Sequence, residues 1–244
     1  MNLIIDVGNT QAKLAVFEGS ALVFDTVCKT DLLLVELQKI NKDFLIDQSI
    51  ISTVALFSED KLSEIKKILP HLIVLSHNTT VPFKNLYGTP QTLGVDRIAN
   101  AAASVSKYPN KNVLVIDAGT CITYDFVNKE GSYIGGAITA GVKMRYASLN
   151  EFTDGLPLLD PVYPKSMIGK STKESIHSGI VNGVLAEINS IISQYKEQYQ
   201  KLTVVLTGGD TNFLAKRLKN GIFANPIFLL EGLNMILIYN SKND

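Results

Sequence analysis

Hydrophobic residues at the start of the chain fall in short runs broken by turn-forming residues, which is typical of strands joined by tight connections. The runs at residues 2–7, 13–17 and 21–27 predict three strands. Gly8-Asn9-Thr10 and Glu18-Gly19-Ser20 are hairpin-type turn signals between them. The chain therefore opens with three strands linked by hairpin turns.

Helical and strand patterns alternate after this point. Residues 30–41 predict a helix, and residues 58–69 predict a second, amphipathic helix with an acidic start. Apolar runs at residues 49–55 and 71–76 predict a strand after each helix. The predicted order is three strands, helix, strand, helix, strand, which is an α/β arrangement.

The second half of the chain begins in the same way. Residues 112–120 predict a strand and turn, residues 121–128 a strand, and residues 130–139 a turn and strand. Asp6 in "IDVG" matches Asp117 in "IDAG" at an offset of 111, and the word "EGS" recurs at an offset of 112. Two matches in the same order, in equivalent predicted elements, favour two copies of one α/β unit over chance.

The two copies meet near residues 110–112, so we expect domains at residues 1–111 and 112–244. The second domain continues with a long predicted helix at about residues 172–199 and a strand at 202–206. A helix after "TGGD" and an apolar segment complete the chain.

Composition excludes several classes of function. Hydrophobic residues make up 46% of the 244 residues, enough to form a sizeable core. Lys+Arg and Asp+Glu are both 23, and this neutral balance argues against a general nucleic-acid binder. Two cysteines and three scattered histidines provide neither a disulfide framework nor a zinc cluster. With no apolar run of about 18 residues and no signal-peptide pattern, we expect a cytoplasmic protein that does not span a membrane.

The first candidate for chemistry is "DVGNTQAK", from Asp6 to Lys13. A carboxylate at a strand end, a glycine that allows close backbone approach, amide and hydroxyl groups and a lysine suit a phosphate chain and its Mg²⁺. An ordinary hairpin in which Asp6 accepts hydrogen bonds from turn amides explains this motif equally well. Recurrence of the motif as "DAGT", where Thr120 repeats the hydroxyl, favours a phosphate cleft between the halves.

Two further loops carry weaker signals. "LTGGD" at residues 206–210 follows an apolar strand and precedes a helix, so it could bring backbone close to an anion. Taken alone, it is better interpreted as a tight turn with Asp210 as the helix N-cap. "GKST" at residues 169–172 resembles the end of a P-loop, but Pro164 stands where that motif needs glycine, and no strand directly precedes it. We therefore reject a P-loop.

The segment "LYGTPQTLGVDR" at residues 86–97 is a loop that leads into the predicted helix "RIANAAASVSKY". Asp96 stands at the start of this helix, where capping is the usual role of aspartate. It is also placed to accept a hydroxyl proton, next to Arg97, which could hold an anionic substrate. Tyr87 could pack against a ligand and form a hydrogen bond.

Taken together, "DVGNTQAK", "YGTPQTLGVDR", "DAGT", "GGAITAG" and "TGGD", in this order along essentially the whole chain, resemble the type III pantothenate kinases. These enzymes belong to the acetate and sugar kinase/Hsp70/actin superfamily. The resemblance implies duplicated ribonuclease H-like domains with a nucleotide cleft between them. It also implies phosphorylation of pantothenate with ATP, a requirement for Mg²⁺ and for K⁺ or NH₄⁺, and a homodimer. The chain departs from the family pattern at Ala140, where proline is usual.

The resemblance also implies roles for individual residues. Asp96 would be the proton acceptor, Asp117 would bind the monovalent cation, and Thr120 would contact ATP. The ATP phosphates would lie along the first hairpin, formed by Asp6, Val7, Gly8, Asn9, Thr10, Gln11, Ala12 and Lys13. Pantothenate would contact Tyr87, Gly94, Val95, Asp96, Arg97 and Thr172.

Three other functions remain open from the sequence. A non-catalytic regulator of the same fold would not need the Asp96–Arg97 pair, and a chaperone-like or actin-like ATPase would have a much longer chain. A kinase for another small alcohol would differ in the "GVDR" loop. ATP consumption with pantothenate, glucose, acetate or no acceptor distinguishes these alternatives.

Overall fold

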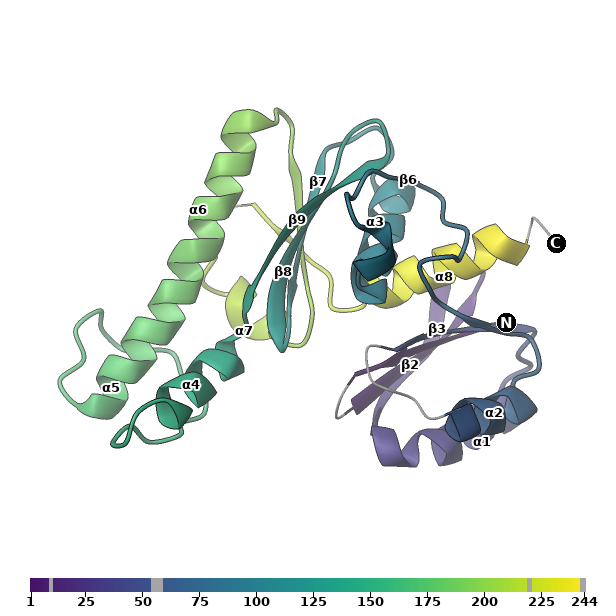
Figure 1. Ribbon diagram of the computed structural model, residues 1–244, viewed down its shortest axis with the longest axis horizontal. Helices are drawn as coiled ribbons and strands as arrows, with labels where there is room; N and C mark the ends of the chain where they lie inside the picture. The colour runs from purple at the N-terminus through teal and green to yellow at the C-terminus, as the bar shows by residue number, and fades with distance from the viewer. Residues whose placement is uncertain (9–10, 54–58, 219–220, 242–244) are drawn as a thin grey trace. The chain divides into compact units, whose positions relative to one another are not determined.

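The structure is a computed structural model that describes residues 1–8, 11–53, 59–218 and 221–241 (Figure 1). The chain forms two compact units. Unit 1 comprises Met1–Pro109, Gly131–Tyr133 and Phe228–Asp244, and unit 2 comprises Asn110–Glu130 and Ile134–Ile227. These two units are defined by the packing of the chain. The predicted domains at residues 1–111 and 112–244 are defined by the duplicated halves instead, and this division into domains stays a prediction.

Unit 1 is built on a sheet with the strand order β3-β2-β1-β4-β5. Its strands are β1 (Asn2–Val7), β2 (Gln11–Glu18), β3 (Ala21–Lys29), β4 (Gln48–Thr53) and β5 (Leu72–Val74). Strand β1 pairs antiparallel with β2 and parallel with β4, and β4 pairs parallel with β5. The three-strand opening and the alternation that follows it are confirmed.

The alternation of side chains along β1 places one set of residues against a helical layer. Leu3, Ile5 and Val7 are buried with residues of α1 (Leu33–Asp43), which follows a 3₁₀ turn (Thr30–Leu32), and of α2 (Glu59–Ile68). The alternate residues of β1, including Asp6, point to the opposite face of the sheet. The strand-end carboxylate therefore lies on the face away from α1 and α2.

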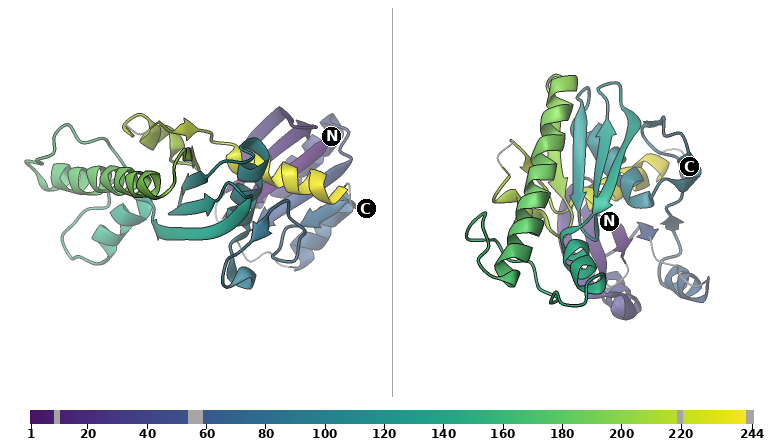
Figure 2. Two further views of the ribbon diagram at one scale, coloured as in Figure 1. Left: turned by 90° about the horizontal axis from the view of Figure 1, so that it is seen from above. Right: turned by 60° about the vertical axis from the view of Figure 1, so that its left-hand side comes forward.

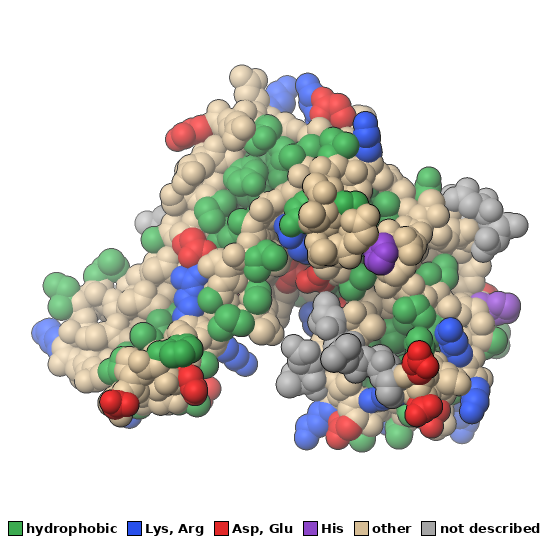
Figure 3. Space-filling model, in the orientation of Figure 1, with side chains coloured by type: hydrophobic (Ala, Val, Ile, Leu, Met, Phe, Trp, Pro, Cys, Tyr) green, Lys and Arg blue, Asp and Glu red, His purple; other side chains and the backbone are tan. Residues whose placement is uncertain are grey.

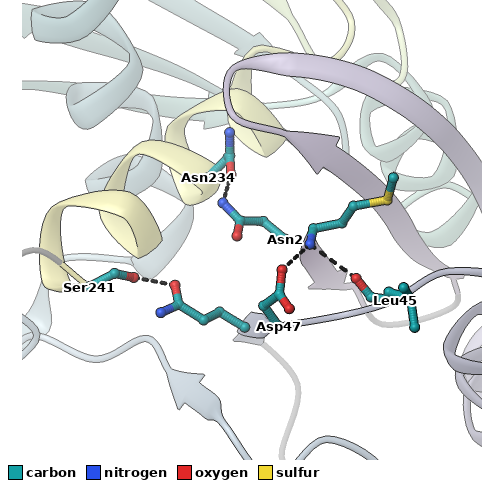
Figure 4. Close-up of polar contacts among 7 residues, drawn as sticks. Asn2, Leu45, Asp47, Asn234 and Ser241 are labelled. Carbon is teal, nitrogen blue, oxygen red and sulfur yellow. Dashed lines mark hydrogen bonds and ion pairs between the residues drawn. The ribbon is translucent and has the colours of Figure 1, made fainter.

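Helices α3 (Val95–Lys107) and α8 (Phe228–Ser241) also belong to unit 1 and lie side by side (Figure 1). They pack so closely that a Cβ on Gly232 would overlap the Ala99 carbonyl. The Asn2 side-chain amide donates a hydrogen bond of 2.8 Å to Asn234 Oδ1, and Ser241 is hydrogen-bonded to Gln48 (Figure 4). The apolar C-terminal segment is thus a helix bound to the first sheet.

The N-terminal amino group is held at the same sheet. It donates a hydrogen bond of 3.0 Å to the Leu45 carbonyl and forms an ion pair with Asp47 (Figure 4). These contacts fix the first residue of the chain beside the start of β4.

Unit 2 repeats the topology of unit 1. Its strands are β7 (Val113–Ala118), β8 (Cys121–Val127), β9 (Ser132–Ala140), β10 (Thr203–Thr207) and β11 (Phe223–Ala224). Their order, β9-β8-β7-β10-β11, matches β3-β2-β1-β4-β5 strand for strand. Strand β7 pairs antiparallel with β8 and parallel with β10, as β1 does with β2 and β4. The predicted duplication is confirmed.

The helices of unit 2 are α4 (Val142–Glu151), α5 (Thr172–His177), α6 (Gly183–Gln198) and α7 (Thr211–Ala215). A π-helical segment, Ser178–Asn182, joins α5 to α6, so the long helix predicted at 172–199 is present with one irregular turn. Helix α6 runs alongside the strands (Figures 1 and 2). Its buried residues Val184, Ile188 and Ile192 share a core with Leu114 and Ile116 of β7.

Several elements differ from the sequence interpretation or were absent from it, among them the following. Helix α3 begins at Val95, two residues before the predicted start, because Gly94 occupies the N-cap position. Helix α4 and the short strand β6 (Lys84–Asn85) had no clear signal. In the described part of the chain, no helix is long and apolar enough to cross a membrane.

Candidate functional site

The first strand-end carboxylate, Asp6, is flanked by residues in register on both neighbouring strands. Lys13 of β2 lies opposite Asp6 in the antiparallel pair, and Ser52 of β4 lies beside it in the parallel pair. Residues in register on adjacent strands project from the same face of a sheet. Asp6 thus shares its face with a positive charge on one side and a hydroxyl on the other.

The rest of the first hairpin offers mainly backbone groups. The Gly8 N–H donates a hydrogen bond of 2.9 Å to the Gln11 carbonyl, which closes the turn. Val7 and Ala12 are fully buried in the core. They could therefore contact a nucleotide only through their main chain. The predicted contacts at residues 9–10 lie outside the described residues.

The second strand-end carboxylate, Asp117, has the equivalent position in unit 2. Its neighbours in register are Thr123 of β8 and Thr207 of β10, which are both uncharged. Asp6 by contrast lies opposite Lys13. Thr120 is exposed at the turn after β7. The two halves therefore present the same carboxylate in different electrostatic surroundings.

Two glycine loops converge on the turn at Asp117. Gly208 of "TGGD" has φ +92°, and a Cβ there would overlap both Asp117 Oδ1 and the Ala118 carbonyl. A Cβ on Gly141 would overlap the carbonyls of Gly119 and Thr120 in the same way. Hydrogen bonds from Gly141 N to Thr120 O (3.0 Å) and from Asp210 N to Ala118 O (2.9 Å) fasten the loops. The "DAGT", "GGAITAG" and "TGGD" motifs thus form one site in unit 2.

Asp210 at the end of "TGGD" is the N-cap residue of α7, as predicted, although its side chain makes no capping hydrogen bond. Burial raises the pKa of the Asp210 carboxyl, and the nearby Lys143 ammonium acts in the opposite direction. Lys143 is the second residue of α4, whose N-cap is Gly141. The loop cluster therefore includes the Asp210 carboxyl with the Lys143 ammonium near it.

The predicted catalytic aspartate lies at the start of α3 in unit 1. Gly94 is the N-cap and Asp96 is the second residue of the helix, so the alternative in which Asp96 is the capping residue is wrong. Asp96 Oδ1 accepts a hydrogen bond of 2.9 Å from the Arg97 backbone N–H. It also lies over Gly94, where a Cβ would overlap it. The carboxylate is thereby held at the N-terminal end of the helix.

Arg97 is buried, with 4% of its surface exposed. Its guanidinium carbon lies 5.6 Å from the ring centroid of Tyr87 and 5.9 Å from that of Tyr133. The pairing of β6 with the start of β9 brings Tyr133 into this position, and the two rings are themselves 6.0 Å apart. Cation–π contacts hold the guanidinium beside Tyr87. Tyr87, Gly94, Val95, Asp96 and Arg97 thus lie close together in unit 1.

Thr172 lies in a different place, in a groove of unit 2. It is exposed at the first position of α5, after the N-cap Ser171. The groove has a volume of about 700 Å³ and is lined by Arg145 and Ser148 of α4 and by Ser175 of α5, among other residues. Thr172 belongs to unit 2, whereas the other residues predicted to bind pantothenate belong to unit 1. Neither unit by itself contains the complete predicted set.

A polar network fixes the wall of this groove. Arg145 donates hydrogen bonds to the Ala140 carbonyl (2.9 Å) and to Glu187 Oε2 (2.7 Å), and the Tyr124 hydroxyl donates to Glu187 Oε1 (3.2 Å). Burial, together with the Glu187 carboxylate, raises the pKa of Tyr124 above its usual value. Arg145 thus connects the groove to the end of β9 at Ala140, where this chain departs from the family pattern.

The described residues include no group of three or more His, Cys, Asp and Glu side chains that could hold a metal ion alone. Mg²⁺ bound with a nucleotide usually takes only one or two carboxylates, with phosphates and water completing its shell. Asp6 and Asp117 each place one carboxylate at a strand end, within the number that such a cation takes from the protein.

Comparison with known proteins identifies the family. The model of the family described as type III pantothenate kinase matches residues 2–194. A type III pantothenate kinase of Christiangramia forsetii is 47% identical over 98% of this chain and 99% of that protein, and one of Flavobacterium johnsoniae is 45% identical over the full length of both. The chain belongs to the type III pantothenate kinase family. The family resemblance drawn from the five motifs is confirmed.

Solved structures confirm the fold of this family member. A protein of Campylobacter jejuni assigned to the Baf family of transcriptional activators matches with a TM-score of 0.60 at 22% identity, over 98% of this chain and 99% of that one. The activator of 2-hydroxyisocaproyl-CoA dehydratase from Clostridium difficile matches with a TM-score of 0.55 at 13% identity, over 99% and 96%. At these identities the likeness shows the fold, which is the predicted actin-like ATPase fold, and not the activity.

Several residues that pack against the predicted site residues were not identified from the sequence. Gly141 was present in a quoted motif, but its packing on Thr120 depends on contacts between distant segments. Tyr133 and Arg145 had no signal, since each reaches its position through packing between segments. The recurrence of hydroxyl residues next to Asp6 and Asp117 could have been found by aligning the two halves.

Proposed function

We propose that this protein transfers the γ-phosphoryl group of ATP to the primary hydroxyl of pantothenate, giving 4′-phosphopantothenate in the first step of coenzyme A synthesis. Membership of the type III pantothenate kinase family supports the reaction. The observation that carries the proposal is the start of α3, where Asp96 lies over Gly94 and the next residue, Arg97, is buried.

Asp96 is the proton acceptor in this proposal. An alcohol is a weak nucleophile at neutral pH, so a carboxylate within hydrogen-bond reach both aligns the hydroxyl and takes its proton. Asp6 and Asp117 lie at strand ends that we assign to the phosphates and cations. Asp96, held by the Arg97 N–H and by its place over Gly94, is left for the acceptor.

Arg97 and Tyr87 orient pantothenate. A guanidinium recognises a carboxylate through two parallel hydrogen bonds, and pantothenate carries one carboxylate at the end remote from the hydroxyl. The rings of Tyr87 and Tyr133 fix the guanidinium carbon at 5.6 Å and 5.9 Å from their centroids. Binding of the carboxylate there determines which end of pantothenate faces ATP. The Thr172 hydroxyl is the further substrate contact.

The first hairpin binds the phosphates of ATP. Lys13, opposite Asp6, provides the positive charge, and the hairpin from Asp6 to Lys13 lies along the phosphates. Thr120 provides a hydroxyl at the turn of the second half. Bound Mg²⁺ would neutralise phosphate charge beside Asp6.

Asp117 holds the monovalent cation, K⁺ or NH₄⁺. The uncharged neighbours in register, Thr123 and Thr207, support this assignment, because no lysine lies opposite this carboxylate as Lys13 lies opposite Asp6. A cation there adds positive charge beside the phosphates.

We also propose that the protein is a cytoplasmic homodimer. Large apolar side chains are exposed along the segment before α5, with Met167 and Ile168 each 75% exposed and Phe152 84% exposed. Hydrophobic side chains are also visible on the surface around α4 and α5 (Figure 3). Burial of such residues against a second copy is the expected use of this surface. A fully active monomer in sedimentation at micromolar concentration would exclude it.

The deciding experiment incubates the protein with ATP, Mg²⁺ and K⁺ and one acceptor: pantothenate, glucose, acetate or none. Phosphopantothenate should be found by mass spectrometry with pantothenate only. Asp96→Asn should lower kcat by about 10²–10⁴-fold and leave ATP binding intact. Asp60→Asn, which changes a first-turn aspartate of α2, is the matched control. Folded protein that binds ATP without forming product would instead support a regulatory relative.

A further inference from the structure

Three buried hydroxyl groups, those of Ser52, Tyr163 and Thr207, have no hydrogen-bond partner among the residues that the structure describes, and Ser52 and Thr207 occupy equivalent positions. Ser52 Oγ and Thr207 Oγ1 are both unpartnered, and the two residues are 0% and 1% exposed. Ser52 is in register with Asp6 on the adjacent parallel strand, and Thr207 is in register with Asp117 in the same way. The duplicated halves thus repeat one arrangement, a strand-end carboxylate beside a buried hydroxyl.

Burial of a polar group without a partner is unfavourable, and the great majority of buried polar side chains are hydrogen-bonded. Two such groups at the same topological position, each beside a proposed cation-binding carboxylate, indicate a shared function. A hydroxyl can donate one hydrogen bond and offers two lone pairs, so it suits a water molecule or a hydrated cation held by the carboxylate.

The surroundings of Thr207 provide a second argument. Gly208 follows it at φ +92°, and a Cβ on Gly208 would overlap Asp117 Oδ1. The backbone after Thr207 is therefore shaped to let the Asp117 carboxylate approach. In the same loop the Thr211 hydroxyl donates a hydrogen bond of 2.7 Å to the Gly208 carbonyl. The fold satisfies the Thr211 hydroxyl, although Thr211 is as buried as Thr207, so burial alone does not account for the unpartnered group.

We propose that Thr207 and Ser52 are positioning residues, whose hydroxyl groups bind the hydration water of the cations held by Asp117 and Asp6 respectively. Thr207 acts on the monovalent cation and Ser52 on the divalent cation of the nucleotide. The inference rests on the proposed function for the identity of these ligands. It adds two residues to the predicted site residues: Thr207, the first residue of "TGGD", and Ser52, which lies outside the motifs.

The test for Thr207 is the stabilisation of the protein by K⁺. Thr207→Val removes the hydroxyl and keeps the β-branched shape, whereas Thr207→Ser keeps the hydroxyl. Loss of one hydrogen bond should raise the K⁺ concentration for half-maximal increase in melting temperature about five- to ten-fold in Thr207→Val. Thr207→Ser should restore the response, and Thr203→Val, on the same face of the same strand, should leave it unchanged.

The test for Ser52 compares two serines of β4. Ser49 is as buried as Ser52, but its hydroxyl contacts the His71 carbonyl at 3.4 Å. Ser49→Ala should lower the melting temperature without ligands, and Ser52→Ala should not, because it removes no hydrogen bond. Ser52→Ala should instead require about five- to ten-fold more MgATP for half-maximal stabilisation.

The outcomes separate this inference from the proposed function. Wild-type-like responses in Thr207→Val and Ser52→Ala, in an enzyme that phosphorylates pantothenate, would overturn the inference and leave the function intact. A wild-type protein that K⁺ does not stabilise would overturn the role of Thr207. A lower melting temperature of Ser52→Ala or Thr207→Val without ligands would show that the hydroxyl is structural. Altered K⁺ and MgATP responses in a protein without pantothenate kinase activity would support the inference and refute the function.

Discussion

Replacement of Gly94 by alanine tests whether the position of the Asp96 carboxylate determines turnover. Gly94 is the N-cap of α3 and has φ −58° and ψ 138°, a conformation that alanine adopts without strain. The added Cβ would overlap Asp96 Oδ1, while its other neighbours, Asp96 Cγ at 3.6 Å and Arg97 Cγ at 3.8 Å, are at ordinary contact distance. The substitution therefore displaces one functional oxygen and little else.

The geometry gives the size of the effect. Ordinary contact begins at 3.4 Å, so the Asp96 oxygen must retreat. A retreat of about 1 Å moves a proton acceptor out of line by an amount that costs ~10²-fold in rate. The hydrogen bond from the Arg97 N–H to Asp96 Oδ1 would also be lost. Alanine is a poorer N-cap than glycine by roughly 0.5–1 kcal/mol, which corresponds to about 1–4 °C in melting temperature.

The assay measures phosphopantothenate formation at saturating ATP and pantothenate, together with the melting temperature. Gly88→Ala is the matched control, because it lies in the same loop and a Cβ there would contact nothing within 4 Å. We expect Gly94→Ala to turn over about 100-fold more slowly than Gly88→Ala, with the KM for ATP unchanged. Turnover within two-fold of wild type would refute the assignment of Asp96 as the base.

Three further predictions concern single residues. Asp117→Asn should abolish the dependence of activity on K⁺, and an unchanged K⁺ response would reject Asp117 as the cation ligand. Tyr133→Leu should raise the KM for pantothenate about two- to thirty-fold and leave the KM for ATP unchanged, since one cation–π contact to Arg97 is lost. Tyr133→Phe, which keeps the ring, should have the wild-type KM for pantothenate. Equal KM values for pantothenate in Tyr133→Leu and Tyr133→Phe would contradict the proposed role of the Tyr133 ring in holding Arg97. The pKa of Tyr124 is raised in the folded state. The contribution of Tyr124 to the free energy of unfolding is therefore complete below pH 10, and above pH 10 it declines by up to about 1.4 kcal/mol per pH unit. In denaturant unfolding between pH 9 and 11, the free energy of unfolding should decline less for Tyr124→Phe than for wild type. Identical declines in the two proteins would show that Tyr124 does not cause the pH dependence.

The duplicated topology could be predicted because its signals are local. Each strand is a short apolar run, and Asp6 and Asp117 end equivalent strands within almost identical words. Hydrophobic periodicity and turn residues are sufficient to define such elements. The functional assignment of Asp96 likewise came from a contiguous motif.

The remaining features depend on contacts between distant segments. The guanidinium of Arg97 is enclosed because β6 pairs with the start of β9, which places Tyr133 beside it. No periodicity within either segment encodes that pairing. The alternative in which Asp96 is only the N-cap fails because Gly94 fills that position, and a pattern of residue types does not distinguish the two residues.

Comparison of the two halves explains how one fold could provide two different electrostatic sites. The carboxylates of Asp6 and Asp117 are equivalent, and each has a buried hydroxyl residue on the adjacent parallel strand. The halves differ on the antiparallel side, where Lys13 faces Asp6 and Thr123 faces Asp117. The Thr123 hydroxyl donates a hydrogen bond of 2.9 Å to Asp125 Oδ2 and carries no charge, so it cannot replace a lysine. A site with a lysine suits a phosphate chain, and a site without one suits a free cation.

The substitution Thr123→Lys should therefore convert the second site towards the first and remove the K⁺ requirement. A Thr123→Lys enzyme that still needs K⁺ would show that the difference between the halves has another origin.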